Sequence, residues 1–246
     1  MNNLQRISAK DVQIKLTDII TGTTWSPLLR TFISGIDFEE IVEQLIYETE
    51  QGKRFVPKVK DVLNPFKHCS YSDLKVVIIG QDPYPWLFKS EKELTVADGL
   101  AFSCGYTMRK QPSLDKIQEA IGRTVYNDPE YLLTPDLRIW ADQGVLLLNS
   151  AFTTELNKPG THYHIWKPFL VYLLDSLMHN TKDVVYILLG KVAQQLEELI
   201  DENNNLILKA QHPAAASYSK TNWDCNDVFN KANTYIASKN KETIQW

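Results

Sequence analysis

Four short apolar runs constrain the fold of this chain more than any other feature. They are rich in β-branched residues and do not alternate between apolar and polar side chains. The four runs are Lys75–Ile79, Val145–Leu148, Val184–Leu189 and Leu206–Leu208. Such runs are typical of strands that are covered on both faces, as in a parallel sheet. Each run is too short to cross a membrane, so we expect no membrane attachment.

Helical patterns alternate with these runs. Pro112 and Ser113 are typical of a helix start, with Ser113 as the expected N-cap. Apolar residues recur at helical spacing in Ile165–Leu177 and again in Val192–Leu199. Strands that alternate with helices predict an α/β fold.

Two segments before the first strand complete the predicted organisation. Phe38–Gln51 has a helical pattern that ends at Gly52, and Pro57–Lys67 is expected to be an extended connection. The chain shows no internal repeat and no clear linker. We therefore expect one domain over residues 1–246, with a central four-stranded, mainly parallel sheet flanked by helices.

The polar residues that follow the predicted strands indicate a site. Asp82 follows the first strand, Asn149 the second, Gly190 the third and His212 the fourth. In open parallel sheets, ligands bind beyond the carboxyl ends of the strands. We therefore expect a carboxylate, a carboxamide, an imidazole and a glycine turn to meet in one crevice.

Taken one by one, these residues leave structural and functional interpretations open. Asp82 and His212 each precede a proline, which restricts their backbone, and either could serve only the local structure. Asn149 could simply satisfy nearby backbone groups. His162 and His164 lack a third suitable ligand close by, so the sequence does not favour a metal site.

Composition and missing motifs argue against several functional classes. The net charge of −4 argues against a protein that coats nucleic acid, although it leaves room for a small basic footprint. The 3 cysteines form no CxxC pair, which argues against a disulfide framework or zinc ribbon and indicates a reducing compartment. The absence of GxGxxG, Walker and GxSxG motifs argues against dinucleotide dehydrogenases, P-loop nucleotidases and common serine hydrolases.

Several ordered motifs resemble those of the family 1 uracil-DNA glycosylases. They are Gly80–Tyr84 (GQDPY), Gly99–Ser103 (GLAFS), Trp140–Asn149 (WADQGVLLLN) and Leu208–Ser217 (LKAQHPAAAS). The match extends over most of the chain, and several motifs at compatible spacing are far more specific than any one of them. The resemblance implies the uracil-DNA glycosylase fold. It also implies an enzyme without metal or cofactor that flips deoxyuridine out of DNA and hydrolyses the N-glycosidic bond in base-excision repair.

The resemblance also implies the catalytic roles. Asp82 should lie beneath the sugar, stabilise the oxocarbenium-like cation and orient the attacking water. His212 should donate a hydrogen bond to the developing uracil anion, most usefully as a neutral imidazole.

Four further residues should bind uracil by the same resemblance. Gln81 should contribute a backbone amide, and Phe102 should stack on the flipped base. Tyr84 should occupy the space that the 5-methyl group of thymine would need. Asn149 should read the uracil edge, since it can donate and accept, and cytosine would leave its groups unpaired.

The expected DNA contacts are local. Ser113, Gly190 and Ser217 fall where the family contacts the DNA backbone through hydroxyls and amides, which would reconcile DNA binding with the acidic net charge. Pro112 belongs to the same DNA-binding loop at the helix start. We expect uracil-containing DNA, single- or double-stranded, as the partner, together with a proteinaceous glycosylase inhibitor. The default expectations are a monomer and a cytoplasmic location, or a nuclear one in a eukaryote.

The sequence departs from the family pattern around the expected site. Pro85 stands where histidine is common, and Lys191 stands where serine is usual, which would replace a hydroxyl–phosphate bond by a salt-sensitive charge contact. The segment Trp86–Thr95 makes the chain longer than the family spacing. We expect it to expose Trp86, Leu87 and Phe88 near the mouth of the site. It is either a surface loop packed on itself or an added DNA or partner contact.

The most consequential departure is Ala216, which stands where the family inserts leucine into the base stack. Lys220 replaces a nearby arginine. A methyl group cannot fill the gap that a flipped nucleotide leaves. We therefore expect weak retention of the flipped base in duplex DNA and a preference for single strands.

Three other functions compete with an active uracil-DNA glycosylase. One is a relative with shifted base preference, which Tyr84 and Asn149 disfavour for thymine and cytosine. Another is a non-catalytic uracil-DNA-binding or replication accessory module, which has no need of Asp82 beneath the sugar. The third is a small-molecule phosphosugar binder, which would require the motif match to be accidental.

Overall fold

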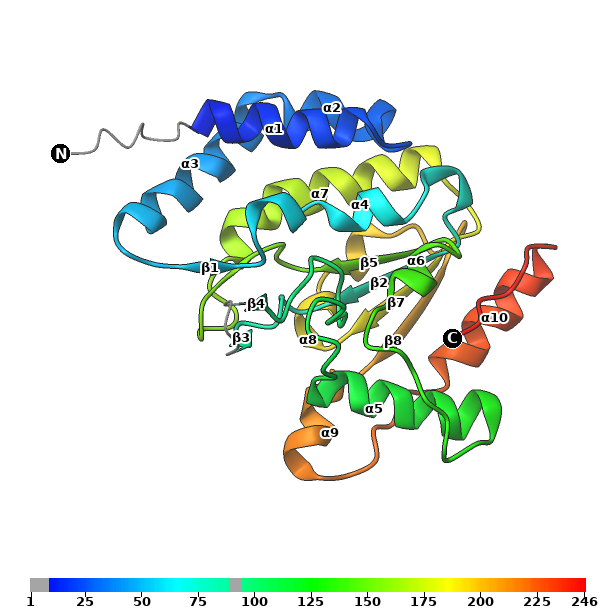
Figure 1. The fold of residues 1–246 in the computed structure, drawn as a ribbon. Helices are drawn as coiled ribbons and strands as arrows, with labels where there is room; N and C mark the ends of the chain where they lie inside the picture. The colour runs from blue at the N-terminus through cyan, green and yellow to red at the C-terminus, as the bar shows by residue number, and fades with distance from the viewer. Residues whose placement is uncertain (1–8, 89–93) are drawn as a thin grey trace.

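A four-stranded parallel sheet lies at the centre of the computed structural model, which describes residues 9–88 and 94–246 (Figure 1). Its strands are β2 (Val76–Gly80), β5 (Val145–Asn149), β7 (Val185–Leu189) and β8 (Leu206–Ala210). Their order is β5-β2-β7-β8, and every neighbouring pair is parallel. The predicted sheet is confirmed, and the four sequence runs match its strands to within two residues at each end.

Burial explains why these runs lack alternation. Every residue of β2, β5 and β7 is buried, whereas the edge strand β8 exposes Lys209. The covering helix α7 (Tyr163–Asn180) buries Ile165, Phe169 and Leu173, which confirms the helical pattern predicted there. Burial of each such side chain contributes about 1.5–3 kcal/mol to stability.

Helices cover both faces of the sheet (Figure 1). α7 lies between the sheet and the N-terminal helices, while α10 packs on β7 and β8. The other helices are α1 (Ala9–Thr21), α2 (Ser26–Ile33), α3 (Ile36–Glu50), α4 (Asn64–His68), α5 (Pro112–Ile121), α6 (Arg138–Ala141), α8 (Lys191–Gln194), α9 (Pro213–Ser219) and α10 (Val228–Ser238). None of the helices in the described ranges is both long and apolar enough to cross a membrane.

Short elements surround the sheet. Two antiparallel pairs join β1 (Phe55–Val56) to β6 (Thr154–Glu155), and β3 (Leu87–Phe88) to β4 (Leu94–Thr95). The 3₁₀ turns are η1 (Val59–Asp61), η2 (Tyr71–Asp73) and η4 (Glu197–Leu199), and α5 continues into a π turn over Gly122–Tyr126. The helix predicted before Gly52 is confirmed as α3.

The predicted extended connection over Pro57–Lys67 is wrong. The segment contains the 3₁₀ turn η1 and most of the short helix α4. Pro65 stands in the first turn of α4, where a missing N–H breaks no helical hydrogen bond. The prolines therefore start a helix here and do not prevent one.

Two predicted helix boundaries also differ from the structure. The N-cap of α5 is Gln111, because a residue before proline is driven to extended backbone, and Ser113 lies in the first helical turn. The repeat in Val192–Leu199 is divided between α8 and η4. The Leu196 N–H bonds the Ala193 carbonyl, an i→i−3 bond that tightens the chain and ends the α-helix.

The segment Trp86–Thr95 folds partly on itself. β3 and β4 pair with Leu87 opposite Thr95, and the guanidinium of Arg109 lies 4.2 Å from the ring centroid of Phe88. Leu87 and Phe88 are half-buried, so their expected exposure is wrong, whereas Trp86 is 41% exposed. The part of the predicted segment over residues 89–93 lies outside the described residues.

Candidate active site

A pocket of about 350 Å³ lies beyond the carboxyl ends of β2, β5 and β8. All six residues predicted to bind and cleave the substrate line it, namely Gln81, Asp82, Tyr84, Phe102, Asn149 and His212. They come from four separate motifs, and the parallel register of the strands places them together. The volume falls in the range typical of pockets for small organic groups.

The floor of the pocket places an amide beside an aromatic ring. A Cβ on Gly80 would lie 2.9 Å from Asn149 Oδ1 and 3.0 Å from the Phe102 ring, so only glycine permits both to approach. Asn149 is 6% exposed, and its amide forms no hydrogen bond with any residue in the described part of the chain. A buried amide with free donor and acceptor is suited to a planar polar ligand.

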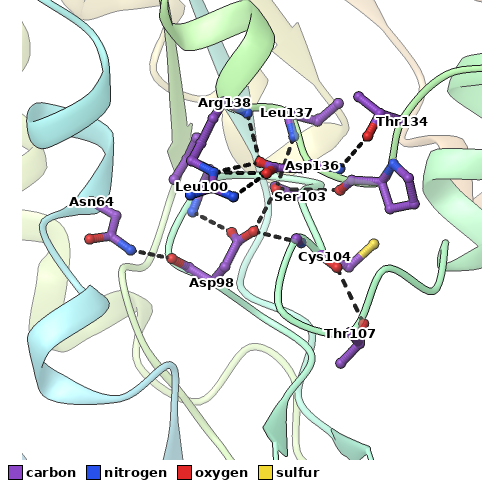
Figure 2. Close-up of polar contacts among 12 residues, drawn as sticks. Asn64, Asp98, Leu100, Ser103, Cys104, Thr107, Thr134, Asp136, Leu137 and Arg138 are labelled. Atoms are coloured by element: carbon purple, nitrogen blue, oxygen red, sulfur yellow. Dashed lines mark hydrogen bonds and ion pairs between the residues drawn. The ribbon is translucent and has the colours of Figure 1, made fainter.

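The Phe102 ring is positioned by an unusual backbone. Phe102 has a φ of 64°, in the left-handed region that non-glycine residues rarely adopt. Figure 2 shows the buried carboxylate that holds this loop: Asp98 accepts hydrogen bonds from Leu100 N at 3.1 Å and from Ser103 Oγ at 2.6 Å. It accepts a third from Gly105 N at 2.8 Å. The sequence interpretation missed Asp98. The only signal for it was an acidic residue directly before the GLAFS motif.

Tyr84 closes one side of the pocket. Its hydroxyl donates to the Phe102 carbonyl at 3.2 Å, which ties the ring to the loop that carries Phe102. The carbonyl of Pro85 accepts a hydrogen bond from Asn157 N at 2.6 Å, so the turn that carries Tyr84 is also held by a segment outside the pocket. The tyrosine is thus a rigid wall, as a steric gate requires.

Asp82 presents a carboxylate that is largely removed from solvent. Burial raises the pKa of Asp82, while the hydrogen bond from the Gly160 N–H acts in the opposite direction. This donor holds one side of the carboxylate, and the residue also lines the pocket. A partly desolvated negative charge interacts strongly with positive charge that develops nearby.

The hydrogen bonding of His212 fixes its tautomer. Ala214 N donates to His212 Nδ1 at 3.3 Å, so Nδ1 is the acceptor and the proton of the neutral ring is assigned to Nε2. Burial lowers the pKa of His212 to about 4. The neutral imidazole therefore offers an N–H donor across the physiological pH range.

Two contacts hold the His212 ring in place. Its centroid lies 5.6 Å from that of Phe102. Gly190 has a φ of 94°, and a Cβ there would lie 2.9 Å from the His212 Cβ, so a side chain at this turn would displace the histidine. Gly190 thus supports the site from outside the pocket lining.

Comparison with known proteins identifies the family. Residues 66–237 match the Uracil DNA glycosylase superfamily. The chain belongs to this superfamily. A uracil-DNA glycosylase from Francisella tularensis subsp. tularensis is 34% identical over 227 residues, which cover 91% of this chain and 98% of the relative. The enzyme from Francisella tularensis subsp. novicida is 34% identical over 226 residues, with the same coverage.

Solved structures of this superfamily share the fold. Mimivirus uracil-DNA glycosylase superposes with a TM-score of 0.81 at 28% identity, covering 96% of this chain and 90% of that one. A mimivirus variant in complex with UGI gives a TM-score of 0.80 at 26% identity, covering 96% and 92%. The Nitratifractor salsuginis protein, at 19% identity and a TM-score of 0.60, supports the fold alone.

The residues predicted to contact DNA are distributed unevenly around the pocket of this superfamily member. Pro112, Ser113 and Ser217 line the mouth, and the Ser217 hydroxyl donates to the Pro112 carbonyl at 2.9 Å. Lys191, Lys220 and Ala216 lie outside the lining.

Ala216, which is predicted to contact DNA, has little exposed surface. It is 7% exposed and belongs to the hydrophobic core, because its side chain points to the inner side of α9. Its contact with DNA stays a prediction. The sequence interpretation missed Tyr218, which lines the mouth and is 85% exposed.

His162 has a structural role. Its Nδ1 lies 2.8 Å from the Thr153 hydroxyl and its Nε2 lies 2.9 Å from a carboxylate oxygen of Glu48. Both ring nitrogens are thus occupied within the protein. The described residues contain no group of three His, Cys, Asp or Glu side chains placed to hold a metal ion.

Proposed function

We propose that the chain is a family 1 uracil-DNA glycosylase, which hydrolyses the N-glycosidic bond of a deoxyuridine flipped into this pocket. Uracil excision itself follows from membership of the superfamily and from the curated relatives. The assignment to family 1 and the roles of individual residues are our inference. The observation that carries them is one pocket that joins a half-buried carboxylate, a neutral imidazole with its proton on Nε2 and an unpaired carboxamide.

The reaction separates charge, and the pocket matches both signs. As the bond between C1′ and N1 breaks, its electron pair leaves with uracil, and the sugar becomes an oxocarbenium-like cation. Asp82 stabilises the cation and orients water, whose oxygen bonds to C1′ while its proton passes to the carboxylate or to solvent. His212 Nε2–H donates a hydrogen bond to the anionic uracil oxygen. Preorganised groups of this kind are a large source of rate enhancement.

Recognition follows from the floor and wall of the pocket. Phe102 stacks on the base, Asn149 donates to and accepts from the uracil edge, and the Gln81 backbone adds a further donor. Tyr84 rejects thymine because its ring, fixed by the bond to the Phe102 carbonyl, fills the space of the 5-methyl group. Cytosine would leave the buried Asn149 amide mispaired, which costs about 1–3 kcal/mol or more.

The partners follow from the same assignment. The neutral rim residues Pro112, Ser113 and Ser217 contact the DNA backbone, with Gly190, Lys191 and Lys220 as outer contacts. We further propose that a glycosylase inhibitor of the UGI type binds the chain, as UGI is found with a mimivirus relative. We also propose that residues 1–246 act as one domain, as a monomer, inside the cell.

Excision from an end-labelled oligonucleotide with one deoxyuridine tests the proposal. The substrates are a single strand, a U·G duplex and a U·A duplex, in EDTA, with alkali to cleave abasic sites. We expect cleavage of all three. Asp82→Asn should lower the single-turnover rate at least about 100-fold by removing the charge under the sugar.

The control is Asp175→Asn, because Asp175 lies in α7 with its side chain 68% exposed, outside the pocket lining. It should retain the wild-type rate. Absence of cleavage by the wild-type chain, with uracil-dependent binding intact, would instead indicate a non-catalytic binding module.

A further inference from the structure

Tyr218 is an exposed aromatic side chain at the mouth of the pocket. It is 85% exposed and lines the pocket entrance together with Ser113 and Ser217. Its hydroxyl makes no hydrogen bond with any residue in the ranges that the structure describes. Folding gains little from a ring that stays in water, because the hydrophobic contribution scales with the apolar surface that is buried.

The geometry of α9 explains why Tyr218 projects outward and Ala216 does not. Residues two apart on a helix point in directions about 200° apart. Ala216 is buried against the core, so Tyr218 must face solvent. The position where the resemblance places an inserting leucine thus exposes little surface, whereas the tyrosine two residues later is 85% exposed.

α9 is held firmly relative to the pocket. His212 is its N-cap, and the Ser217 hydroxyl bonds the Pro112 carbonyl at the start of α5. Tyr218 follows His212 by six residues, which is about 9 Å along a helix. One rigid element therefore carries a group that contacts the base inside the pocket and a ring at its entrance, on the side from which the nucleotide must come.

Trp86 is the other exposed aromatic residue of the lining. It is 41% exposed, and its Nε1 donates to Gln111 Oε1 at 3.2 Å. Gln111 is in turn the N-cap of α5, so the indole is tethered along the rim. Tyr218 lacks such a tether and has the larger free face.

We propose that Tyr218 enters the base stack of duplex DNA and fills the gap left by the flipped deoxyuridine. This inference rests on the proposed function, and it assigns to Tyr218 the role that the resemblance places at Ala216. The flat ring stacks on the bases on either side of the gap, as aromatic side chains do with unstacked bases. The chain should then act well on duplex DNA, contrary to the single-strand preference expected from Ala216.

Uracil excision by Tyr218→Ala from matched single-stranded and duplex oligonucleotides tests the proposal. The single-turnover rate on U·A duplex should fall between about 5-fold and about 150-fold, the range set by loss of one base–aromatic stack. The rate on the single strand should change less than about 3-fold, because no stack has to be filled there. Tyr218→Phe should behave as wild type on both substrates, since the ring and not the hydroxyl is required.

The control is Tyr47→Ala, which removes a ring that is 63% exposed on α3, outside the pocket lining. It should leave both rates unchanged. An equal loss on both substrates, or no loss on either, would overturn the role of Tyr218. A duplex-specific loss in Trp86→Ala but not in Tyr218→Ala would also overturn it.

A fluorescent reporter distinguishes retention of the flipped base from cleavage of the glycosidic bond. With 2-aminopurine next to the uracil, wild type should give a stable rise in fluorescence on duplex DNA, and Tyr218→Ala a smaller one. If the wild-type chain excises no uracil from any substrate, the proposed function fails. Normal single-strand excision with an unaffected duplex rate in Tyr218→Ala defeats only the present inference.

Discussion

The pH dependence of uracil release is the most direct test of the proposed role of His212. Burial lowers the pKa of this ring to about 4, which favours the neutral form by about 3 kcal/mol over an ordinary histidine. At pH 5.5 only about 3% of the folded chains should carry a protonated ring, against about 90% at an ordinary pKa of about 6.5. If the neutral ring is the active form, uracil release at pH 5.5 should lose less than about a tenth of its rate through His212.

The assay is the single-turnover release of uracil from a single-stranded oligonucleotide, between pH 5 and pH 8 at constant ionic strength. His212→Asn, which keeps a neutral side-chain donor, is measured in parallel. Asp82 has a raised pKa and also loses its charge in acid, so a decline shared by both proteins belongs to Asp82. A decline centred near pH 6.5 in wild type and missing in His212→Asn would refute the neutral-imidazole mechanism.

The lowered pKa of His212 also makes the stability of the fold depend on pH. Because the folded pKa lies below the unfolded one, the contribution of His212 is fully present above about pH 6.5 and is lost as the pH falls toward about 4. Over that window the free energy of unfolding should fall by up to about 1.4 kcal/mol per pH unit through this group. Urea unfolding of wild type and His212→Asn measures the difference.

Three substitutions test the supports of the pocket. Tyr84→Ala should open space for a 5-methyl group and allow thymine release from a T·A oligonucleotide; a variant that releases no thymine leaves the steric gate unsupported. Asp98→Leu removes the acceptor of three hydrogen bonds, so the free energy of unfolding in urea should drop by about 2–4 kcal/mol and KM should rise as the Phe102 loop loosens. Gly190→Ala should press on His212 and lower kcat at least about 10-fold, and a wild-type kcat would show that the histidine tolerates displacement.

Most of the architecture was predictable from local pattern. The four apolar runs specify the strands because a strand that is buried on both faces carries apolar side chains at successive positions. The convergence of Asp82, Asn149 and His212 followed from parallel order alone. The roles of these residues came from the resemblance, and they stay predictions until excision is measured.

What could not be predicted depends on tertiary contacts. The direction of Ala216 and Tyr218 is set by how α9 docks on the core, which no local pattern reveals. The role of Asp98 is visible only in the structure, where three hydrogen-bond donors lie around its carboxylate. The helix in Pro57–Lys67 was missed because prolines that start a helix and prolines that prevent one have the same composition.

Adjacent strands carry Gly80 and Asn149 directly opposite each other in the ladder. The base reader and the loop that bears Asp82 are thus locked to one another, and they can separate only if the sheet itself opens. The entrance is built outside this ladder, since Trp86 lies beside the β3–β4 pair and Tyr218 lies on α9. The sheet edge therefore fixes the geometry of the reacting groups, and the entrance residues lie outside it. Substitutions at the entrance can change which DNA is admitted without altering the chemistry in the pocket.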